Sequence, residues 1–146
     1  MNSNQSIKTQ MWITLLLVST LSIAQPSNQK SDISQVRETL NKYLNGTANG
    51  DPDLLREAFH PDFNLYTVNP DGSLWIRSGE KYISAFKKGV KSSRTGKIVN
   101  IDIENTVATA RIDLTMNGKA YVDYFLLAKY EGKWRIIQKS YAIKAE

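Results

Sequence analysis

The chain has 146 residues, of which 41% are hydrophobic and 23% charged, a composition that predicts one globular domain. It has no cysteine, which excludes disulfides, thiol nucleophiles and cysteine-based zinc sites, and its single histidine excludes a metal site built from several histidines. The net charge of +5 comes from scattered basic residues rather than a basic stripe, so we expect no nucleic-acid partner.

The first 24 residues have the pattern of a secretory signal peptide. Lys8 supplies a positive charge, an apolar run begins at residue 11 and extends to about residue 21, and Ser22-Ile23-Ala24 offers the small residues that signal peptidase recognises. We expect cleavage after Ala24, export to the periplasm or the outside of the cell, and no stable membrane association afterwards. The alternative is an uncleaved anchor, although the run is short for a membrane-spanning helix.

Residues 25–31 are polar and contain Pro26, which predicts a flexible linker before a folded domain over residues 32–146. Asp32 then suits the cap or first turn of a helix that we expect to stop at Asn45-Gly46. Its apolar residues recur at three- and four-residue steps, which indicates one buried stripe: Ile33, Val36, Leu40, Tyr43 and Leu44.

A second helix should begin at Asp51-Pro52 and end before Pro61, because the residue preceding a proline is disfavoured in a helix. Two strands follow, over residues 63–68 and 74–77, joined by a turn rich in proline and glycine. Ser78-Gly79 opens a third helix with an apolar stripe at Tyr82, Ile83, Phe86 and Val90.

An alternating strand over residues 98–103 leads into a three-stranded meander whose two turns fix its register. Asn117-Gly118 and Glu131-Gly132 are two-residue turns that suit positive φ at their central positions. A two-residue loop sets the pairing of the strands on either side. We expect these partners: Met116 with Lys119, Leu114 with Tyr121, Ile112 with Asp123, Ala110 with Phe125, Tyr130 with Lys133, Leu127 with Ile136, Phe125 with Gln138, and Asp123 with Ser140.

Strand side chains alternate between faces, so this register places Asp123, Phe125, Gln138 and Ser140 on the inner, apolar face. The first strand of the meander identifies that face, because it alternates alanine, isoleucine and leucine with threonine, arginine and aspartate. A carboxylate on an apolar face is costly unless it is paired, hydrogen-bonded or hydrated. Asp123 is therefore the most informative residue of the chain.

The outer face of the last two strands is too apolar to meet only water. Contiguous apolar surface of this kind marks a partner interface, and we expect a homodimer. The alternative is that a terminal or linker segment of the same chain covers this face. The residues that we expect at the dimer interface are Val122, Tyr124, Leu126, Ile137 and Tyr141.

The order of elements, helix, helix, hairpin, helix and four strands, predicts an α+β fold with helices on one side of a curved antiparallel sheet. With three local motifs it resembles the nuclear transport factor 2-like superfamily over residues 32–146. Its SnoaL-like members and its putative lumazine-binding branch are the most similar. The motifs are Tyr43-Leu44-Asn45-Gly46 with Gly50-Asp51, Ala58-Phe59-His60-Pro61-Asp62 followed by Asp71-Gly72 and Trp75, and Glu131-Gly132-Lys133-Trp134-Arg135-Ile136. The resemblance implies a cone-shaped sheet with a pocket between sheet and helices.

Asp123 is a candidate general base or proton donor, or a structural carboxylate held by Arg77, Ser140 or water. His60 is a candidate base at the pocket mouth, or a cap for a helix-terminal carbonyl. Tyr66 and Trp75 either stack on a planar ligand or complete the core. Phe125, Gln138 and Ser140 point inward by register and should line the cavity.

Two functions remain open, beside a third interpretation as an interaction domain that acts mainly through its dimer face, and none of them involves a metal or another cofactor. The first is an exported domain that binds a small molecule with Tyr66, Trp75, Asp123, Phe125, Gln138 and Ser140. The second is a cofactor-free isomerase, dehydratase or hydrolase that uses Asp123 and His60. An enzyme of this kind needs two ionisable groups in one apolar cavity. Because the sequence places only Asp123 there, it favours binding.

Overall fold

A computed structural model describes residues 30–144. The predicted signal peptide and cleavage site lie outside the described residues, as does most of the predicted linker. The elements in chain order are α1 (Asp32–Asn49), α2 (Pro52–Ala58), β1 (Phe59–Val68), β2 (Leu74–Ser78), α3 (Gly79–Ile83), β3 (Thr95–Glu104), β4 (Val107–Met116), β5 (Lys119–Tyr130) and β6 (Lys133–Ile143).

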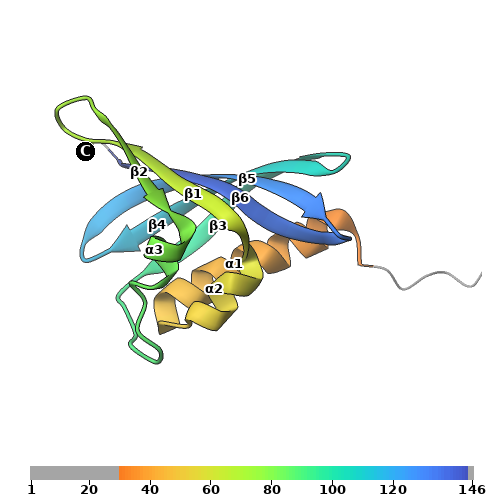
Figure 1. The fold of residues 1–146 in the computed structure, drawn as a ribbon, viewed down its shortest axis with the longest axis horizontal. Helices are drawn as coiled ribbons and strands as arrows, with labels where there is room; N and C mark the ends of the chain where they lie inside the picture. Colours follow the sequence, from red (N-terminus) through yellow and green to blue (C-terminus); the bar gives the residue numbers. More distant parts are fainter. Residues whose placement is uncertain (1–29, 145–146) are drawn as a thin grey trace, which may run out of the picture.

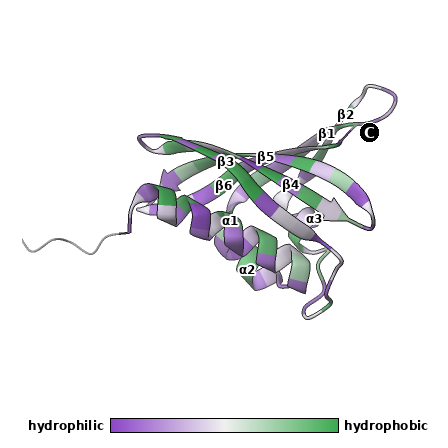
Figure 2. Ribbon diagram, turned by 180° about the vertical axis from the view of Figure 1, so that it is seen from behind, coloured by the Kyte–Doolittle hydropathy of each residue, from purple (hydrophilic) through white to green (hydrophobic). Residues whose placement is uncertain are grey.

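The six strands form one curved sheet in the order β2-β1-β6-β5-β4-β3, and the helices lie on one side of it (Figure 1). This confirms the predicted α+β fold with three helices, although the sheet is mixed, because β1 pairs with β6 in parallel. Figure 2 shows hydrophobic and hydrophilic residues alternating along α1, as expected of an amphipathic helix. Within residues 30–144, no helix is both long and apolar enough to cross a bilayer.

Helix α1 continues one turn beyond its predicted end. It passes through Gly46 and ends at Asn49, with Gly50 as its C-cap in the left-handed conformation at a φ of 61°. Gly46 is instead a packing position, since a Cβ atom there would lie 2.7 Å from Leu55 Cδ2 on α2. Gly46, predicted as a helix stop, therefore allows α1 and α2 to approach closely.

The boundaries after α2 also differ from the prediction. Asp51 caps α2 by accepting hydrogen bonds from the backbone N–H groups of Asp53 and Leu54, as expected. Strand β1 then begins directly at Phe59, and its pairing with β6 is irregular between Phe59 and Asn64. That interval contains Pro61, which lacks the N–H group that a ladder requires.

Helix α3 is shorter than predicted. It ends at Ile83, and Val90, which the predicted stripe placed on the buried side, is 59% exposed. Tyr82 and Ile83 are buried in the core, while Phe86 packs partly against it. Only the first turn of the predicted helix is therefore helical.

The meander has the predicted turns, with positive φ at Asn117, Gly118, Glu131 and Gly132. All of the predicted β4–β5 pairs are present. The β5–β6 pairing begins as predicted, with Tyr130 opposite Lys133 and Leu127 opposite Ile136.

A β-bulge then shifts the register by one residue, because Leu126 pairs with Gln138 and leaves Ile137 as an extra residue. The predicted partners beyond this point are wrong. Phe125 pairs with Lys139 instead of Gln138, and Asp123 pairs with Tyr141 instead of Ser140. A one-residue shift exchanges the two faces of a strand. Lys139 is accordingly buried and Gln138 is exposed.

Candidate functional site

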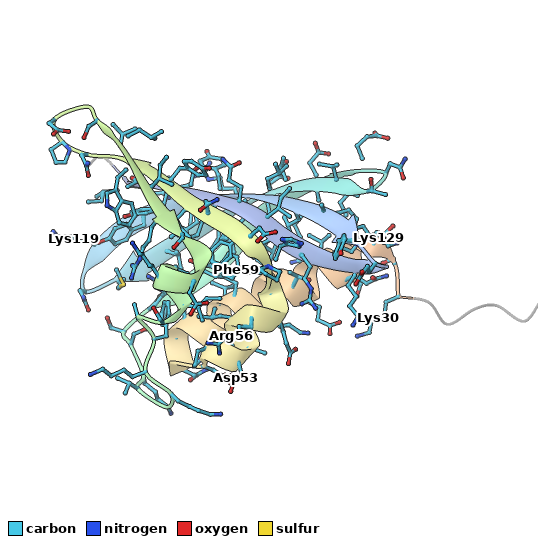
Figure 3. All side chains as sticks on the ribbon, viewed as in Figure 1. Lys30, Asp53, Arg56, Phe59, Lys119 and Lys129 are labelled. Atoms are coloured by element: carbon cyan, nitrogen blue, oxygen red, sulfur yellow. The ribbon has the colours of Figure 1, made fainter. Side chains whose placement is uncertain are left out.

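A cavity of about 220 Å³ opens on the inner face of the curved sheet, between the β1–β2–α3 unit and strands β4–β6, near the Lys119 end of β5. Figure 3 shows Lys119 and Lys129 at opposite ends of this strand, with Phe59 between them in the interior. The cavity has aliphatic and aromatic walls with four charged side chains among them. Its lining residues are Leu65, Trp75, Arg77, Tyr82, Arg94, Leu114, Met116, Tyr121, Asp123, Lys139 and Tyr141.

Asp123 forms the polar floor of this cavity. It is 1% exposed and both of its carboxylate oxygens are bonded. The Tyr43 hydroxyl donates to Oδ2 at 2.5 Å, and Lys139 Nζ lies 3.0 Å from Oδ1. The ion pair and the hydrogen bond together offset the cost of burying the carboxylate.

Arg77 and Ser140, the two residues predicted as structural partners of Asp123, do not contact it. Arg77 donates instead to the carbonyl oxygen of Lys81 at 2.6 Å. Ser140 lies beyond the bulge, on the outer face of β6, where it pairs with Tyr124 and Tyr66. The true partners, Tyr43 and Lys139, come from α1 and from the shifted part of β6.

Lys139 is enclosed by aromatic rings as well as by Asp123. Its Nζ lies 4.7 Å from the ring centroid of Tyr141 and 5.7 Å from that of Tyr43. Burial lowers the pKa of Lys139, and Asp123 opposes this by stabilising the ammonium form. Burial, reinforced by Tyr82 and Asp123, raises the pKa of Tyr43 well above its usual value, so its hydroxyl keeps the proton that it donates.

Arg94 enters the cavity from the segment before β3. Its Nη1 lies 3.4 Å from the hydroxyl oxygens of both Tyr43 and Tyr82, and its Nη2 lies 3.3 Å from Met116 Sδ. The Arg77 guanidinium lies on another side of Tyr82, 5.8 Å from its ring centroid. Two guanidinium groups therefore flank one tyrosine at the edge of the cavity.

The structure brings together only some of the residues predicted for the site. Trp75 and Asp123 line the cavity, and Phe125 points inward as predicted but is core, with its ring centroid 5.0 Å from that of Tyr43. The inward placement of Gln138 and Ser140 is wrong. Tyr66 lies with Ser140 along a separate groove, on the other face of the sheet.

His60 also lies away from Asp123. Its Nδ1 accepts a hydrogen bond from the Asp62 backbone N–H at 3.2 Å, and its ring packs edge-on against Tyr130 at 5.3 Å between centroids. It lines a separate cavity of about 170 Å³ beside Phe59 and Phe63. It lies within β1 and caps no helix-terminal carbonyl group in the part of the chain that the structure describes.

Sequence reasoning missed Tyr43, Tyr82, Arg94 and Lys139 as site residues. The two tyrosines were assigned to apolar helix stripes, and Arg94 was counted among the scattered basic residues. Lys139 was assigned to the outer face. A signal for it was present, because a buried Asp123 requires a cation nearby and Lys139 is next to Ser140, the predicted strand partner of Asp123.

Among residues 30–144, no group of three or more histidine, aspartate or glutamate side chains could hold a metal ion.

Comparison with solved structures identifies the fold as nuclear transport factor 2-like. An NTF2-like protein of unknown function from Shewanella baltica OS155 is 28% identical, with a TM-score of 0.70 over 81% of this chain and 100% of that chain. An NTF2-like protein of unknown function from Methylobacillus flagellatus KT is 30% identical, with a TM-score of 0.68 over 78% and 93%. An uncharacterized protein with a cystatin-like fold from Caulobacter vibrioides is 21% identical, with a TM-score of 0.55 over 77% of this chain and 89% of that chain.

The chain belongs to the family described as Putative lumazine-binding, which matches residues 31–142. Among curated proteins no sequence matches it significantly. Family and fold together indicate a ligand-binding domain of the NTF2-like type.

Proposed function

We propose that this chain is exported and binds one small, planar, partly aromatic molecule in the cavity above Asp123. The observation that carries the proposal is a cavity with aromatic walls and a fully bonded polar floor. Ligand sites typically combine apolar walls with a few fixed polar groups. Trp75, Tyr82, Tyr121 and Tyr141 supply flat surfaces for a ring.

The size of the cavity supports a ligand with one ring or two fused rings. A cavity of roughly 150 Å³ holds benzene, and drug-sized ligands occupy about 300–1,000 Å³. The present cavity, about 220 Å³, lies between these limits. A molecule as large as a steroid would have to extend out of it.

The alternative function, a cofactor-free isomerase, dehydratase or hydrolase, requires an available base. Both oxygens of Asp123 are already engaged, by Tyr43 and by Lys139. His60, the other predicted catalytic residue, lines a different cavity. These contacts support a role for Asp123 in orienting Lys139 and Tyr43, and they favour binding over catalysis.

Native mass spectrometry of the protein purified from its own host tests both parts of the proposal. We expect a mature chain that begins at Gln25, as the predicted cleavage site requires, and a second peak heavier by the mass of one small ligand. Trp75→Leu should abolish the heavier peak, whereas Tyr130→Leu, an exposed aromatic outside the cavity, should retain it.

Two results would contradict the proposal. A mass that retains residues 11–21 would indicate an anchor rather than a cleaved signal peptide. A heavier peak that persists in Trp75→Leu and disappears in Tyr130→Leu would place the ligand elsewhere on the molecule.

A further inference from the structure

The charges of the cavity do not cancel. Its lining includes three cations, Arg77, Arg94 and Lys139, and one anion, Asp123. Lys139 and Asp123 neutralise each other at 3.0 Å, with side chains 5% and 2% exposed. This leaves two guanidinium charges on the wall without an opposing charge in the lining.

The groups that hydrogen-bond to Arg94 and Arg77 carry no charge. Arg94 approaches two hydroxyl oxygens and a thioether sulfur, and Arg77 donates to a backbone carbonyl. Within residues 30–144, no carboxylate lies within 4.0 Å of either guanidinium group, although eight ion pairs join other lysine or arginine side chains to carboxylates. A half-buried cation whose partners are neutral gains more than an exposed one from an arriving anion, because water screens it less.

We propose that the ligand carries a carboxylate, which Arg94 and Arg77 bind beside Tyr82 while the ring lies against the aromatic wall. This inference rests on the proposed function, since it assigns a chemical class to the ligand of that cavity. The guanidinium group is planar and offers paired N–H donors, which match the two oxygens of a carboxylate. A ring with one carboxylate also fits a space somewhat larger than benzene requires.

The lysine of the cavity is not the anion site. Its ammonium group is already paired with Asp123, and a carboxylate ligand would meet that aspartate as well. The Asp123–Lys139 pair is neutral overall, so the attraction of the two arginines places the carboxylate at the arginine side and the ring above the pair. The orientation of the ligand therefore follows from the positions of the charges.

Isothermal titration with two matched pairs of probes tests the inference: benzoate with benzamide, and pterin-6-carboxylate with pterin. Within a pair the members share a ring and differ in charge. We expect the carboxylate to bind about tenfold more tightly than its neutral partner, the effect of one charge-assisted hydrogen bond. The difference should narrow between about 50 mM and about 500 mM salt, because salt screens the attraction.

Arg94→Gln and Arg77→Gln should each reduce the preference for the carboxylate, measured as the ratio of the dissociation constants of the neutral and carboxylate members of a pair. Arg135→Gln is the matched control, because Arg135 lies outside this cavity. Arg94→Lys keeps the charge without the planar donors and should retain part of the preference. Circular dichroism of each variant identifies any variant that does not fold. If Arg94→Gln does not fold, Arg77→Gln still tests the inference.

The outcomes separate the two proposals. Equal binding of the carboxylate and neutral probes overturns the inference and leaves the ring-binding function standing. Binding of acetate that depends on Arg94, without binding of any ring, supports the anion site and contradicts the ring-binding function. If neither the rings nor acetate bind at millimolar concentration, both proposals are wrong.

Discussion

At the scale of single residues, Asp123 is stable in the interior because two neighbours meet its two oxygens. Tyr43 donates to one oxygen, and the ammonium group of Lys139 faces the other. Each member is buried and depends on the others, since removal of one leaves a polar or charged group without compensation. The network therefore couples α1 to the centre of the sheet.

Asp123→Asn should destabilise the fold by about 3–5 kcal/mol, because the amide leaves the Lys139 ammonium buried without its counter-charge. The double variant Asp123→Leu with Lys139→Met should cost less than this single change, since it removes both charges together. Urea denaturation of the three proteins measures the difference. A double variant less stable than Asp123→Asn would contradict this expectation. It would show that the ion pair itself contributes net stability, beyond avoiding an unpaired buried charge.

At the scale of elements, the carboxylate of Asp32 connects the start of α1 to the last hairpin through hydrogen bonds. Asp32 Oδ1 accepts from Lys129 Nζ at 2.7 Å and from Trp134 Nε1 at 2.9 Å. Hydrogen bonds from Lys129 and then Trp134 lower the pKa of Asp32 below its usual value. The contact joins the first described helix to β5 and β6.

This contact predicts a loss of stability in acid. Because the pKa of Asp32 is lower in the folded state, the unfolded chain takes up the proton first as the pH falls. The stabilisation is present above about pH 4 and is lost below it. Asp32→Asn should therefore lower the urea midpoint at pH 6 and have a smaller effect at pH 3.

Asp102→Asn is the control for this measurement, since Asp102 is exposed on β3 and forms no ion pair within the described residues. It should leave the midpoint nearly unchanged at both pH values. A gap between wild type and Asp32→Asn that is as large at pH 3 as at pH 6 would contradict the role assigned to this carboxylate.

At this scale, the sequence predicted the helix order and most of the meander correctly, but not the register of β6. Local signals sufficed for the helix order, the two tight turns and the whole β4–β5 register, because turn residues and alternation act over a few positions. The β6 register failed at Ile137, where strict alternation gives way to a bulge. A bulge depends on what both neighbouring strands present, and β6 lies between β1 in parallel and β5 in antiparallel.

The same failure explains the errors at the candidate site. Asp123 was placed correctly because the β4–β5 register, which follows from the Asn117-Gly118 turn and contains no bulge, assigns its face. Gln138 and Lys139 exchanged faces, so a neutral amide was predicted where a lysine lies. Arg94 could not be placed, because it lies after Val90, the last residue of the predicted helical stripe, and before the predicted strand at residues 98–103, so no periodic pattern fixes its direction.

At the scale of the whole molecule, the outer face of the sheet is more extensive than the sequence indicated. One row of paired residues crosses it, from Ile76 through Tyr66 and Ser140 to Tyr124. Ile76 is 55% and Tyr124 53% exposed. Tyr141 was predicted to belong to this face, but the bulge turns it into the cavity. The proposed dimer interface therefore excludes Tyr141. It consists of Val122, Tyr124, Leu126, Ile137, Tyr66 and Ile76.

We propose that a second copy of the chain covers this face, since a symmetric dimer buries the same apolar patch on both copies. Stable dimers bury about 800 Å² on each partner, an area that requires a surface spanning several strands, as this one does. Tyr124→Arg combined with Leu126→Glu should then give a monomer in light scattering, because each copy would bury charges against apolar side chains. Ile33→Arg combined with Val90→Glu changes two exposed apolar residues outside the sheet and should remain a dimer. A monomeric wild-type protein, or a dimer that survives the first pair of changes, would mean that this face pairs with something other than its own copy.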